Sequence, residues 1–494
     1  MAVFDISQLS EQNPWWIDKK NILNDFKLST LNKLKFQWDP NIRQYIKLDA
    51  DVIYTIRGPR QVGKTTLIKM IIKDLLLHKN IKPENIFFWS SERNDSKELN
   101  QVIQTYFDWR LDSKNERKYI FIDEICSVKN WPHEIIYFAN KGSLKNCSLI
   151  LTGSHSMDLK HSTELMPGRR GGRDDEPLDK ILLPMKFSEF VNLLWPEFKN
   201  KLFDSEFASK KDGKKKIFEL FEGKISKDIQ NIMIFRKQLD ALFEIYLLTG
   251  GIPSIINEYK MNSKISTKLF NVYLTSIIGD LRRYNYKEHY FKQLIKETYN
   301  VLSNPISWNS FTKNTEVKSH NTVQDYMTAL EELFVANISY RCSIHDKRIH
   351  TFMKKIYLQD PFIFHALHGW SHGKKDYYTN AKANLLNLEM KSKLIEGVVY
   401  NHLCRLSFGL NPRDLFDPKD TVCYYTDKNK KEVDFVLIHD DNYLPFEVKY
   451  QATINSSDFF AFKSFSKGIM ITKDDLGNYR NYVKIPVSIF LLLI

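Results

Sequence analysis

The sequence predicts a multidomain α/β protein, because different hydrophobic patterns follow one another along 494 residues, a length too great for one core. Residues 51–195 alternate short β-branched or aromatic strands with helical patterns, which is typical of a parallel sheet with helices on both faces. The pattern is mainly helical over 196–300, then reads helix, turn, helix and two strands over 301–358. A mixed α/β pattern over 359–494 predicts the last domain. Residues 1–50 are expected to pack on the domain that follows them.

The charge balance favours a polyanionic partner such as nucleic acid. The chain has 72 Lys and Arg residues against 59 Asp and Glu residues, a formal net charge of +13. A basic chain attracts nucleic acid, but a lysine-rich surface alone indicates only non-specific attraction.

Several features predict a cytoplasmic protein without a membrane partner. The five cysteines are scattered and form no CxxC, which argues for a reducing compartment and against a zinc site or a disulfide framework. The N-terminus lacks the basic and apolar regions of a signal peptide. The apolar C-terminal stretch VSIFLLLI is far shorter than the ~20 residues of a membrane span, so we expect a buried strand there.

A phosphate-binding loop is predicted between the first strand and the first helix of region 51–195. The segment GPRQVGKTT fits the pattern G-x-x-x-x-G-K-[ST] in the strand–loop–helix context that this motif requires. Backbone N–H groups and the helix N-terminus of such a loop surround a phosphate. We expect Lys64 to reach the β- and γ-phosphates of ATP, and the Thr65 hydroxyl to ligate Mg²⁺. The predicted nucleotide-binding residues of the loop are Gly58, Pro59, Arg60, Gln61, Val62, Gly63, Lys64, Thr65 and Thr66.

Polar residues at the ends of two further strands complete the predicted ATPase site. The strand YIFIDEI ends in Asp123 and Glu124, at the sheet edge where ligands bind in open α/β folds. Asp123 is expected to hold Mg²⁺, and Glu124 to orient and polarise the attacking water. In SLILTGS, Thr152 or Ser154 could sense the γ-phosphate or hold that water; a simple strand-to-loop transition is the alternative.

A glycine-rich basic loop and a lysine-rich insertion follow. In MPGRRGGR, Arg169, Arg170 and Arg173 suit an arginine finger that reaches the nucleotide of a neighbouring subunit, which predicts a homo-oligomer such as a hexameric ring. A basic loop that contacts solvent or the DNA backbone is the alternative. The helical region 196–300 is interpreted as a lid, and its stretch SKKDGKKK at 209–216 as an exposed loop.

Residues 301–358 fit a winged helix-turn-helix. Ser319 can cap a second helix with apolar residues at i, i+3, i+4 and i+7 spacing, and the two strands after it form a wing. Such a helix enters the major groove, and the wing contacts phosphates. Winged helices also serve as protein–protein spacers, and Asp325, Glu331 and Glu332 lie along this helix. The candidate DNA contacts are Lys318, His320, Asn321, Gln324, Lys347 and Arg348.

The segment EVDFVLIHDDNYLPFEVKY predicts either two ordinary hairpin strands or a metal-dependent nuclease site. Asp434 and Glu447 on paired strands would repel each other unless a divalent cation such as Mg²⁺ lay between them. Lys449 could position the attacking water or the scissile phosphate. Glu396, on the amphipathic helix KLIEGVVYNHLCRL, could supply a third carboxylate. The Glu-x-Lys spacing itself is weak evidence, because similar acid-x-Lys pairs occur elsewhere in the chain.

The chain resembles a large prokaryotic family, abundant in archaea, of AAA-type P-loop ATPases with a winged helix and a C-terminal PD-(D/E)xK domain. The resemblance rests on GPRQVGKTT, YIFIDEI, LTGSHS, LLTGGIP, KIYLQDP, LIEGVVYNHL and EVDFVL…PFEVKY, which follow the family's order. It implies a restriction-endonuclease-like domain, with the Holliday-junction-resolvase branch as one form, in which Glu396, Asp434, Glu447 and Lys449 hold the nuclease roles. The long lysine-rich insertion departs from the family pattern.

Taken together, these features predict a Mg²⁺-dependent ATPase that binds branched or structured DNA and couples ATP hydrolysis to remodelling or to nucleolytic processing. One alternative is a signalling or regulatory ATPase whose nuclease-like and winged-helix domains only bind. Another is a transcription-regulator-like switch that acts through the winged helix.

Overall fold

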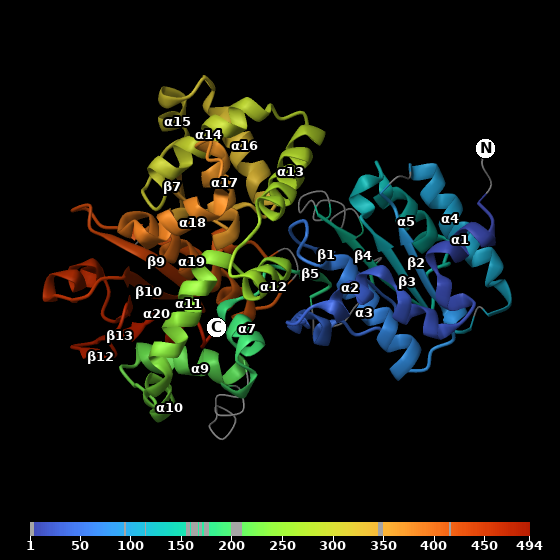
Figure 1. Cartoon of the computed structure of the whole chain (residues 1–494), viewed down its shortest axis with the longest axis horizontal. Coiled ribbons are helices and arrows are strands. Elements are labelled where there is room, and N and C mark those ends of the chain that lie inside the picture. The colour runs from blue at the N-terminus through green and yellow to red at the C-terminus, as the bar shows by residue number, and fades with distance from the viewer. Residues whose placement is uncertain are drawn as a thin grey trace. The chain divides into compact units, whose positions relative to one another are not determined.

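The computed structural model divides into two compact units (Figure 1). The first comprises Met1–Leu183 with Arg413–Leu415, and the second comprises Pro184–Pro412 with Phe416–Ile494. The first unit thus ends before residue 195, where the sequence predicts the end of the ATPase domain. The residues described are 4–92, 95–113, 115–154, 159, 166, 170–171, 177–198, 210–343, 349–413 and 416–494.

The first unit contains a parallel five-stranded sheet in the order β2-β3-β4-β1-β5. The strands are almost wholly buried, as expected for a sheet covered on both faces. Its strands are β1 (Val52–Arg57), β2 (Ile86–Ser90), β3 (Lys118–Asp123), β4 (Cys147–Gly153) and β5 (Asp179–Ile181). Its helices are α1 (Ile6–Gln12), α2 (Phe26–Lys33), α3 (Lys64–Lys73), α4 (Ser96–Trp109) and α5 (Trp131–Asn140).

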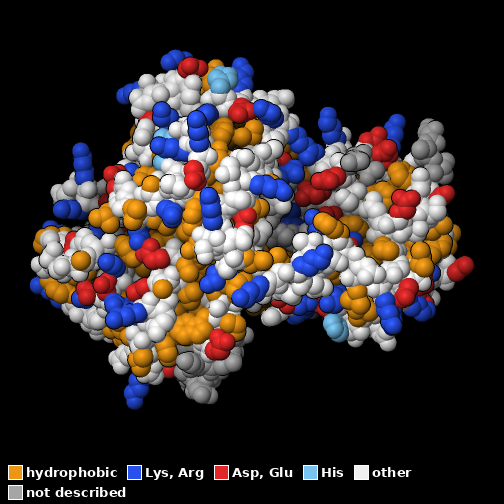
Figure 2. Space-filling view, in the orientation of Figure 1, with side chains coloured by type: hydrophobic (Ala, Val, Ile, Leu, Met, Phe, Trp, Pro, Cys, Tyr) orange, Lys and Arg blue, Asp and Glu red, His pale blue; other side chains and the backbone are white. Residues whose placement is uncertain are grey.

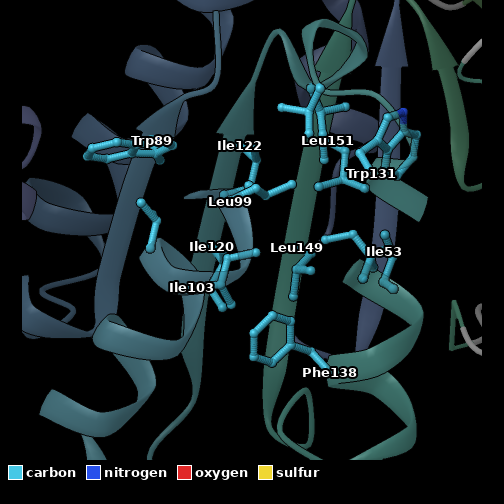
Figure 3. Close-up of a cluster of buried hydrophobic side chains, with 14 of the residues drawn as sticks. Ile53, Trp89, Leu99, Ile103, Ile120, Ile122, Trp131, Phe138, Leu149 and Leu151 are labelled. Carbon is cyan, nitrogen blue, oxygen red and sulfur yellow. The ribbon is translucent and has the colours of Figure 1, made fainter. Parts of the chain in front are cut away.

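One hydrophobic cluster joins the sheet to the helices α4 and α5 (Figure 3). Ile120 of β3 and Leu149 of the neighbouring β4 project toward Ile103 of α4 and Phe138 of α5. Burial of a side chain of this size contributes roughly 1.5–3 kcal/mol to the free energy of unfolding. This cluster holds β3 and β4 in place, so that the carboxyl ends of both strands are positioned rigidly.

The N-terminal segment covers the free edge of β2. Asn13 pairs with the backbone of Phe88: its Oδ1 accepts from the N–H at 2.7 Å and its Nδ2 donates to the carbonyl at 2.9 Å. The indole N–H groups of Trp15 and Trp16 both donate to the carbonyl of Ile86. These contacts satisfy backbone groups that an edge strand would otherwise expose to another chain.

The second unit is built on a mixed eight-stranded sheet in the order β12-β13-β11-β10-β9-β8-β6-β7. Its strands are β6 (Ala336–Cys342), β7 (Ile349–Leu358), β8 (Val422–Thr426), β9 (Glu432–His439), β10 (Asn442–Lys449), β11 (Gly468–Thr472), β12 (Gly477–Tyr479) and β13 (Tyr482–Pro486). Its helices are α7 (Phe187–Leu194), α9 (Lys210–Phe221), α10 (Lys227–Ile232), α11 (Arg236–Thr249), α12 (Pro253–Asn262), α13 (Thr267–Arg283), α14 (Glu288–Val301), α15 (Trp308–Asn314), α16 (His320–Glu332), α17 (Pro361–Ser371), α18 (Tyr377–Leu386), α19 (Leu388–Leu410) and α20 (Val487–Phe490).

The hairpin expected to form a separate wing belongs to this sheet. β6 and β7 pair antiparallel, and β6 also pairs parallel with β8 through Arg341↔Tyr424 and Cys342↔Tyr425. Ile306, between α14 and α15, forms an isolated bridge with Lys354 of β7. A domain boundary at residue 358 therefore cuts through one continuous sheet, because β8, which follows this residue, pairs with β6, which precedes it. The two strands are far apart in the sequence.

The structure corrects two local expectations. The lysine-rich stretch is not an exposed loop: residues 210–216 form the first part of α9, in which the Lys216 ammonium is buried and paired with Asp228. The apolar C-terminal stretch is the short helix α20 rather than a strand, and it is buried as expected. The two meet where Gly213 lies against the backbone of Leu493; an added Cβ would stand 2.3 Å from that carbonyl oxygen.

Among the described residues, no single helix is both long and apolar enough to cross a bilayer. One pair of helices, Lys227–Thr249 and Pro253–Asn262, is long and apolar enough when taken together, but the pair is sharply bent at the break between them.

Candidate functional site

The loop between β1 and α3 has the conformation that the phosphate-binding motif predicts. Gly63 precedes α3 at φ +108°, in the left-handed region that favours glycine, and Gln61 is also left-handed at φ +62°. Gly58 lies so close to the chain that an added Cβ would stand 2.1 Å from the carbonyl oxygen of Leu182. In the rest of the loop, Pro59 and Val62 are buried, Arg60, Thr65 and Thr66 are half-buried and Gln61 is exposed.

The ammonium group of Lys64 lies inside this loop. Its Nζ donates to the carbonyls of Gly58 at 2.9 Å and Pro59 at 3.0 Å, and the residue is 5% exposed. Burial lowers the pKa of Lys64, while the nearby Glu124 and Asp123 act in the opposite direction. Because the contacts within the loop are carbonyl dipoles, the positive charge remains for an anion such as a phosphate to neutralise.

Asp123 connects the loop to the ends of β3 and β4. Its Oδ2 accepts from the Thr65 hydroxyl at 2.7 Å, and its Oδ1 accepts from the Thr152 hydroxyl. A hydroxyl and a carboxylate side by side are the oxygen ligands that Mg²⁺ takes in P-loop enzymes. These residues fit such an ion: Thr65 and Asp123 would hold it, and it would supply charge neutralisation at the phosphates.

Glu124 follows Asp123 in a left-handed conformation, at φ +51°. This backbone turn separates its side chain from that of Asp123. Its N–H donates to Thr152 Oγ1 at 3.2 Å, and its Oε2 accepts from the Ser154 hydroxyl at 3.3 Å. Burial raises the pKa of Glu124, and Asp123 adds to the rise while Lys64 opposes it. A carboxylate with raised proton affinity beside the phosphate loop is suited to accept a proton from water. Thr152 and Ser154 both contact Glu124, Thr152 through the backbone N–H and Ser154 through the carboxylate.

Of the three arginines proposed as a finger, Arg170 lies among the described residues, and Arg169 and Arg173 lie outside them. The Arg170 guanidinium pairs with Asp179 at 2.9 Å and donates to the carbonyl of Ile53 at 3.2 Å. The backbone N–H of Ile53 donates in turn to the carbonyl of Arg170 at 2.8 Å. Arg170 therefore ties its segment to β1 within its own chain.

The predicted DNA-reading residues of α16 and its N-terminus are solvent-exposed. Lys318, His320, Asn321 and Gln324 are all exposed, whereas Lys347 and Arg348 lie outside the described residues. Glu331 turns inward: it pairs with Lys419 at 2.8 Å and accepts from the N–H of Ile338 at 3.1 Å. In the space-filling view, Lys and Arg side chains are scattered over the visible face rather than gathered in one patch (Figure 2).

The carboxylates expected to bind metal in the second unit do converge, but on a lysine. The Nζ of Lys355, on β7, lies 2.6 Å from Glu432, 3.5 Å from Glu396 and 3.6 Å from Asp434. The hydroxyl of Tyr357 donates to Glu396 at 2.8 Å. Burial alone would lower the pKa of Lys355, but the attraction of these carboxylates outweighs it and raises the pKa.

Glu447 takes no part in this convergence. Its Oε1 lies 2.7 Å from the Lys449 ammonium, and its Oε2 accepts from the N–H of Asp434 at 3.1 Å. Burial, with the charge of Asp434, raises the pKa of Glu447 to about 8, and the same two causes raise that of Glu396 to about 7. The predicted Mg²⁺ ligand set of Glu396, Asp434 and Glu447 is therefore corrected to a set of ion pairs. In the described part of the chain, no group of three or more His, Cys, Asp or Glu side chains could hold a metal ion.

Lys355 and Tyr357 are the residues that sequence reasoning missed. The signal was present in KKIYL, because consecutive side chains of a strand point to opposite faces, so one of Lys354 and Lys355 must face the interior. Lys354 lies over the Trp308 ring, 4.3 Å from its centroid, and Lys355 faces the carboxylates.

Comparison with known proteins identifies the nucleotide-binding region. Residues 50–191 match the AAA domain family, which confirms the coarser prediction of an AAA-type P-loop ATPase. Residues 240–374 and 391–487 match two domains of unknown function (DUF8612 and DUF4143), which give no evidence for a winged helix or a nuclease. No curated protein matches the chain in sequence.

Several solved structures of ATPases and related proteins show weak similarity. The Walker-type ATPase PABY2304 of Pyrococcus abyssi aligns over 74% of this chain and 97% of its own, at 12% identity and a TM-score of 0.38. The Aeropyrum pernix ORC1 protein, solved in complex with DNA, aligns over 72% and 96%, at 10% identity and a TM-score of 0.29. RuvB of Thermotoga maritima aligns over 67% and 89%, at 15% identity and a TM-score of 0.24. Scores this low do not establish a shared overall fold.

Proposed function

We propose that this protein is an ATPase that acts on DNA, with hydrolysis at the loop of Lys64 and DNA contact through α16. The proposal of DNA contact rests on the composition of the exposed surface of α16 and of the residues just before it. Lys318, just before the helix, and His320, Asn321 and Gln324 on it are exposed. Of the acidic residues, Asp325 is also exposed, while Glu331 is engaged internally with Lys419. Asn and Gln are the residues that read adenine in the major groove, and Lys contacts phosphates or guanine.

The order of elements supports a winged helix as the DNA-binding module. α14, the bridge at Ile306, α15, α16 and the β6–β7 hairpin follow one another as helix, strand, helix, helix and two strands. In such a module the last helix enters the major groove and the hairpin lies along the backbone. The net charge of +13 favours the same kind of partner.

ATP hydrolysis would use the residues of the first unit in separate roles. Lys64 and the loop would bind the phosphates, Thr65 and Asp123 would hold Mg²⁺, and Glu124 would orient and deprotonate the attacking water. A finger from a second copy, contributed by Arg169 or Arg173, would make the active form an oligomer. Branched or structured DNA is the proposed substrate on the basis of the family resemblance.

The second candidate is a regulatory ATPase whose C-terminal modules bind without cutting. The observation that favours it is the occupation of the carboxylate cluster by Lys355. In both candidates, ATP hydrolysis serves remodelling or switching rather than cleavage.

One set of assays tests the proposal. We expect linear or four-way DNA to stimulate ATP hydrolysis, and Lys64→Ala to abolish hydrolysis with or without DNA. Lys318→Ala should weaken DNA binding about equally across sequences and reduce the salt slope by about 1, while Gln324→Ala should alter sequence preference. Lys268→Ala, which removes an exposed lysine of α13, is the matched control and should leave both properties unchanged. If neither linear nor four-way DNA binds to the protein or stimulates its ATP hydrolysis, the proposal that it acts on DNA is rejected. The regulatory ATPase would then remain as the candidate function.

A further inference from the structure

The ammonium group of Lys355 lies where three carboxylates from two elements meet. Glu396 comes from α19, and Glu432 and Asp434 are on the same face of β9. The side chain of Lys355 is 1% exposed, so water contributes almost nothing to its solvation. Its nearest carboxylate oxygen is 2.6 Å away and the others are within 3.6 Å. Burying an ammonium so completely is costly, and nearby anions offset that cost.

The restriction-endonuclease-like fold implied by the resemblance would place a divalent cation among these acidic residues. Mg²⁺ needs near-octahedral oxygen ligands at about 2.0–2.1 Å. Here the oxygens of Glu396, Glu432 and Asp434 surround a nitrogen at hydrogen-bonding and ion-pair distances instead. The remaining acid, Glu447, is paired with Lys449. A second cation beside Lys355 would meet Coulomb repulsion inside a poorly solvated site. The residues present therefore do not fit the metal that the fold implies.

We propose that Lys355 is a built-in cation that takes the place of the divalent metal in the C-terminal domain. The carboxylates serve to fix β7, β9 and α19 to one another, and the domain does not cleave DNA through a metal ion bound there. Its role is that of a binding module. This inference stands whether or not α16 contacts DNA, because it concerns the carboxylate cluster alone.

The neighbouring Lys354 provides a matched control. It is also buried, at 6% exposure, and lies on the same strand, but it packs over Trp308 rather than facing the carboxylate cluster. Lys354→Met and Lys355→Met remove the same charge from adjacent positions. Any effect specific to Lys355→Met therefore reports the carboxylate cluster and not the general loss of a buried lysine.

The test is a Mn²⁺ titration of the full-length, nucleotide-free protein, with free Mn²⁺ followed by electron paramagnetic resonance. We expect neither the wild type nor Lys354→Met to have a Mn²⁺ site that depends on Asp434. Any Mn²⁺ binding by these proteins should therefore be unchanged when Asp434→Asn is added. Lys355→Met should gain one site, at least about tenfold tighter than any in the wild type, and Glu396→Gln in that background should remove it. We also expect Mn²⁺ to raise the unfolding temperature of Lys355→Met alone.

Three results would overturn the inference. A wild-type Mn²⁺ site lost in Asp434→Asn would show that the cluster binds metal with Lys355 in place, and this measurement does not require Lys355→Met to fold. A folded Lys355→Met without a new Mn²⁺ site would show that the lysine does not stand in a metal's position. Mg²⁺-dependent DNA cleavage by the wild type that Asp434→Asn abolishes would also overturn it. Failure of DNA binding alone would affect the proposed function and leave this inference intact.

Discussion

Two buried lysines, Lys64 and Lys355, show how the surroundings of a single residue decide its role. Lys64 contacts backbone carbonyls of its own loop, and burial lowers its pKa. Lys355 contacts three carboxylates, which outweigh burial and raise its pKa. The charge of Lys64 therefore remains available to a phosphate, whereas the charge of Lys355 is already neutralised. The motif around Lys64 could be recognised from the sequence because its spacing is local; the partners of Lys355 come from two other segments, α19 and β9, that are distant from it in the chain.

Arg170 is expected to stabilise its own unit rather than act on a neighbour's nucleotide. The Arg170–Asp179 pair is mostly buried, with side chains 11% and 6% exposed, so removing one partner leaves the other charge buried. Arg170→Ala should lower the free energy of unfolding of the first unit by about 3–5 kcal/mol, measured by denaturant unfolding. Arg169→Ala or Arg173→Ala should instead reduce ATP turnover at unchanged stability. Unchanged stability with lost turnover in Arg170→Ala would identify it as the finger.

At the level of elements, sequence patterns identified strands and helices better than the sheets that they form. The P-loop strand, helix and β3 were predicted because hydrophobic period and motif agree within a short segment. The β6–β7 hairpin was also recognised, but not its pairing with β8, since strand pairing across distant segments leaves no local signal. The lysines of α9 predict a solvated loop by their charge, but the apolar residues Ile217, Leu220 and Phe221 that follow are buried and give the segment a helix with one face in the core.

His402 joins α19 to α7 and should make the second unit sensitive to acid. Its Nε2 accepts from the N–H of Phe187 at 3.0 Å and its Nδ1 donates to the carbonyl of Val398 at 2.8 Å, an arrangement that requires the neutral ring. Burial, with the nearby Arg405, lowers the pKa of His402 from 6.5 to about 3. Between these values the unfolded chain binds a proton that the folded chain does not, so stability is present above about pH 6.5 and is lost as the pH falls.

At pH 5 this linkage should cost about 2 kcal/mol relative to pH 7.5. Urea unfolding of the wild type and of His402→Gln at both pH values measures it, because Gln cannot titrate and can still accept from the N–H of Phe187. The pH-dependent loss should be smaller in the variant by about that amount. Equal losses in both proteins would contradict the assignment of a neutral, buried ring.

At the level of the whole molecule, the chain consists of two compact units with separate sheets. The sequence predicted five segments, and the predicted helical, winged-helix and C-terminal segments share the second unit. The winged-helix and C-terminal segments share a unit because β6 and β7 belong to the same eight-stranded sheet as the strands of the C-terminal region. The nucleotide site, by contrast, lies wholly in the first unit, since all of its described residues precede Leu183.

Nucleotide binding should therefore stabilise one unit selectively. A ligand that binds only the folded state at 100 times its dissociation constant stabilises that state by about 2.7 kcal/mol. For a unit of this size, that corresponds to a rise of roughly 5–10 °C in its unfolding temperature. Differential scanning calorimetry with Mg²⁺ and a non-hydrolysable ATP analogue should show this rise in one transition and no change in the other, and Lys64→Ala should abolish it. A single transition that shifts as a whole would mean that the two units unfold as one cooperative body. A shift that persists in Lys64→Ala would place the nucleotide outside the loop of Gly58–Thr66.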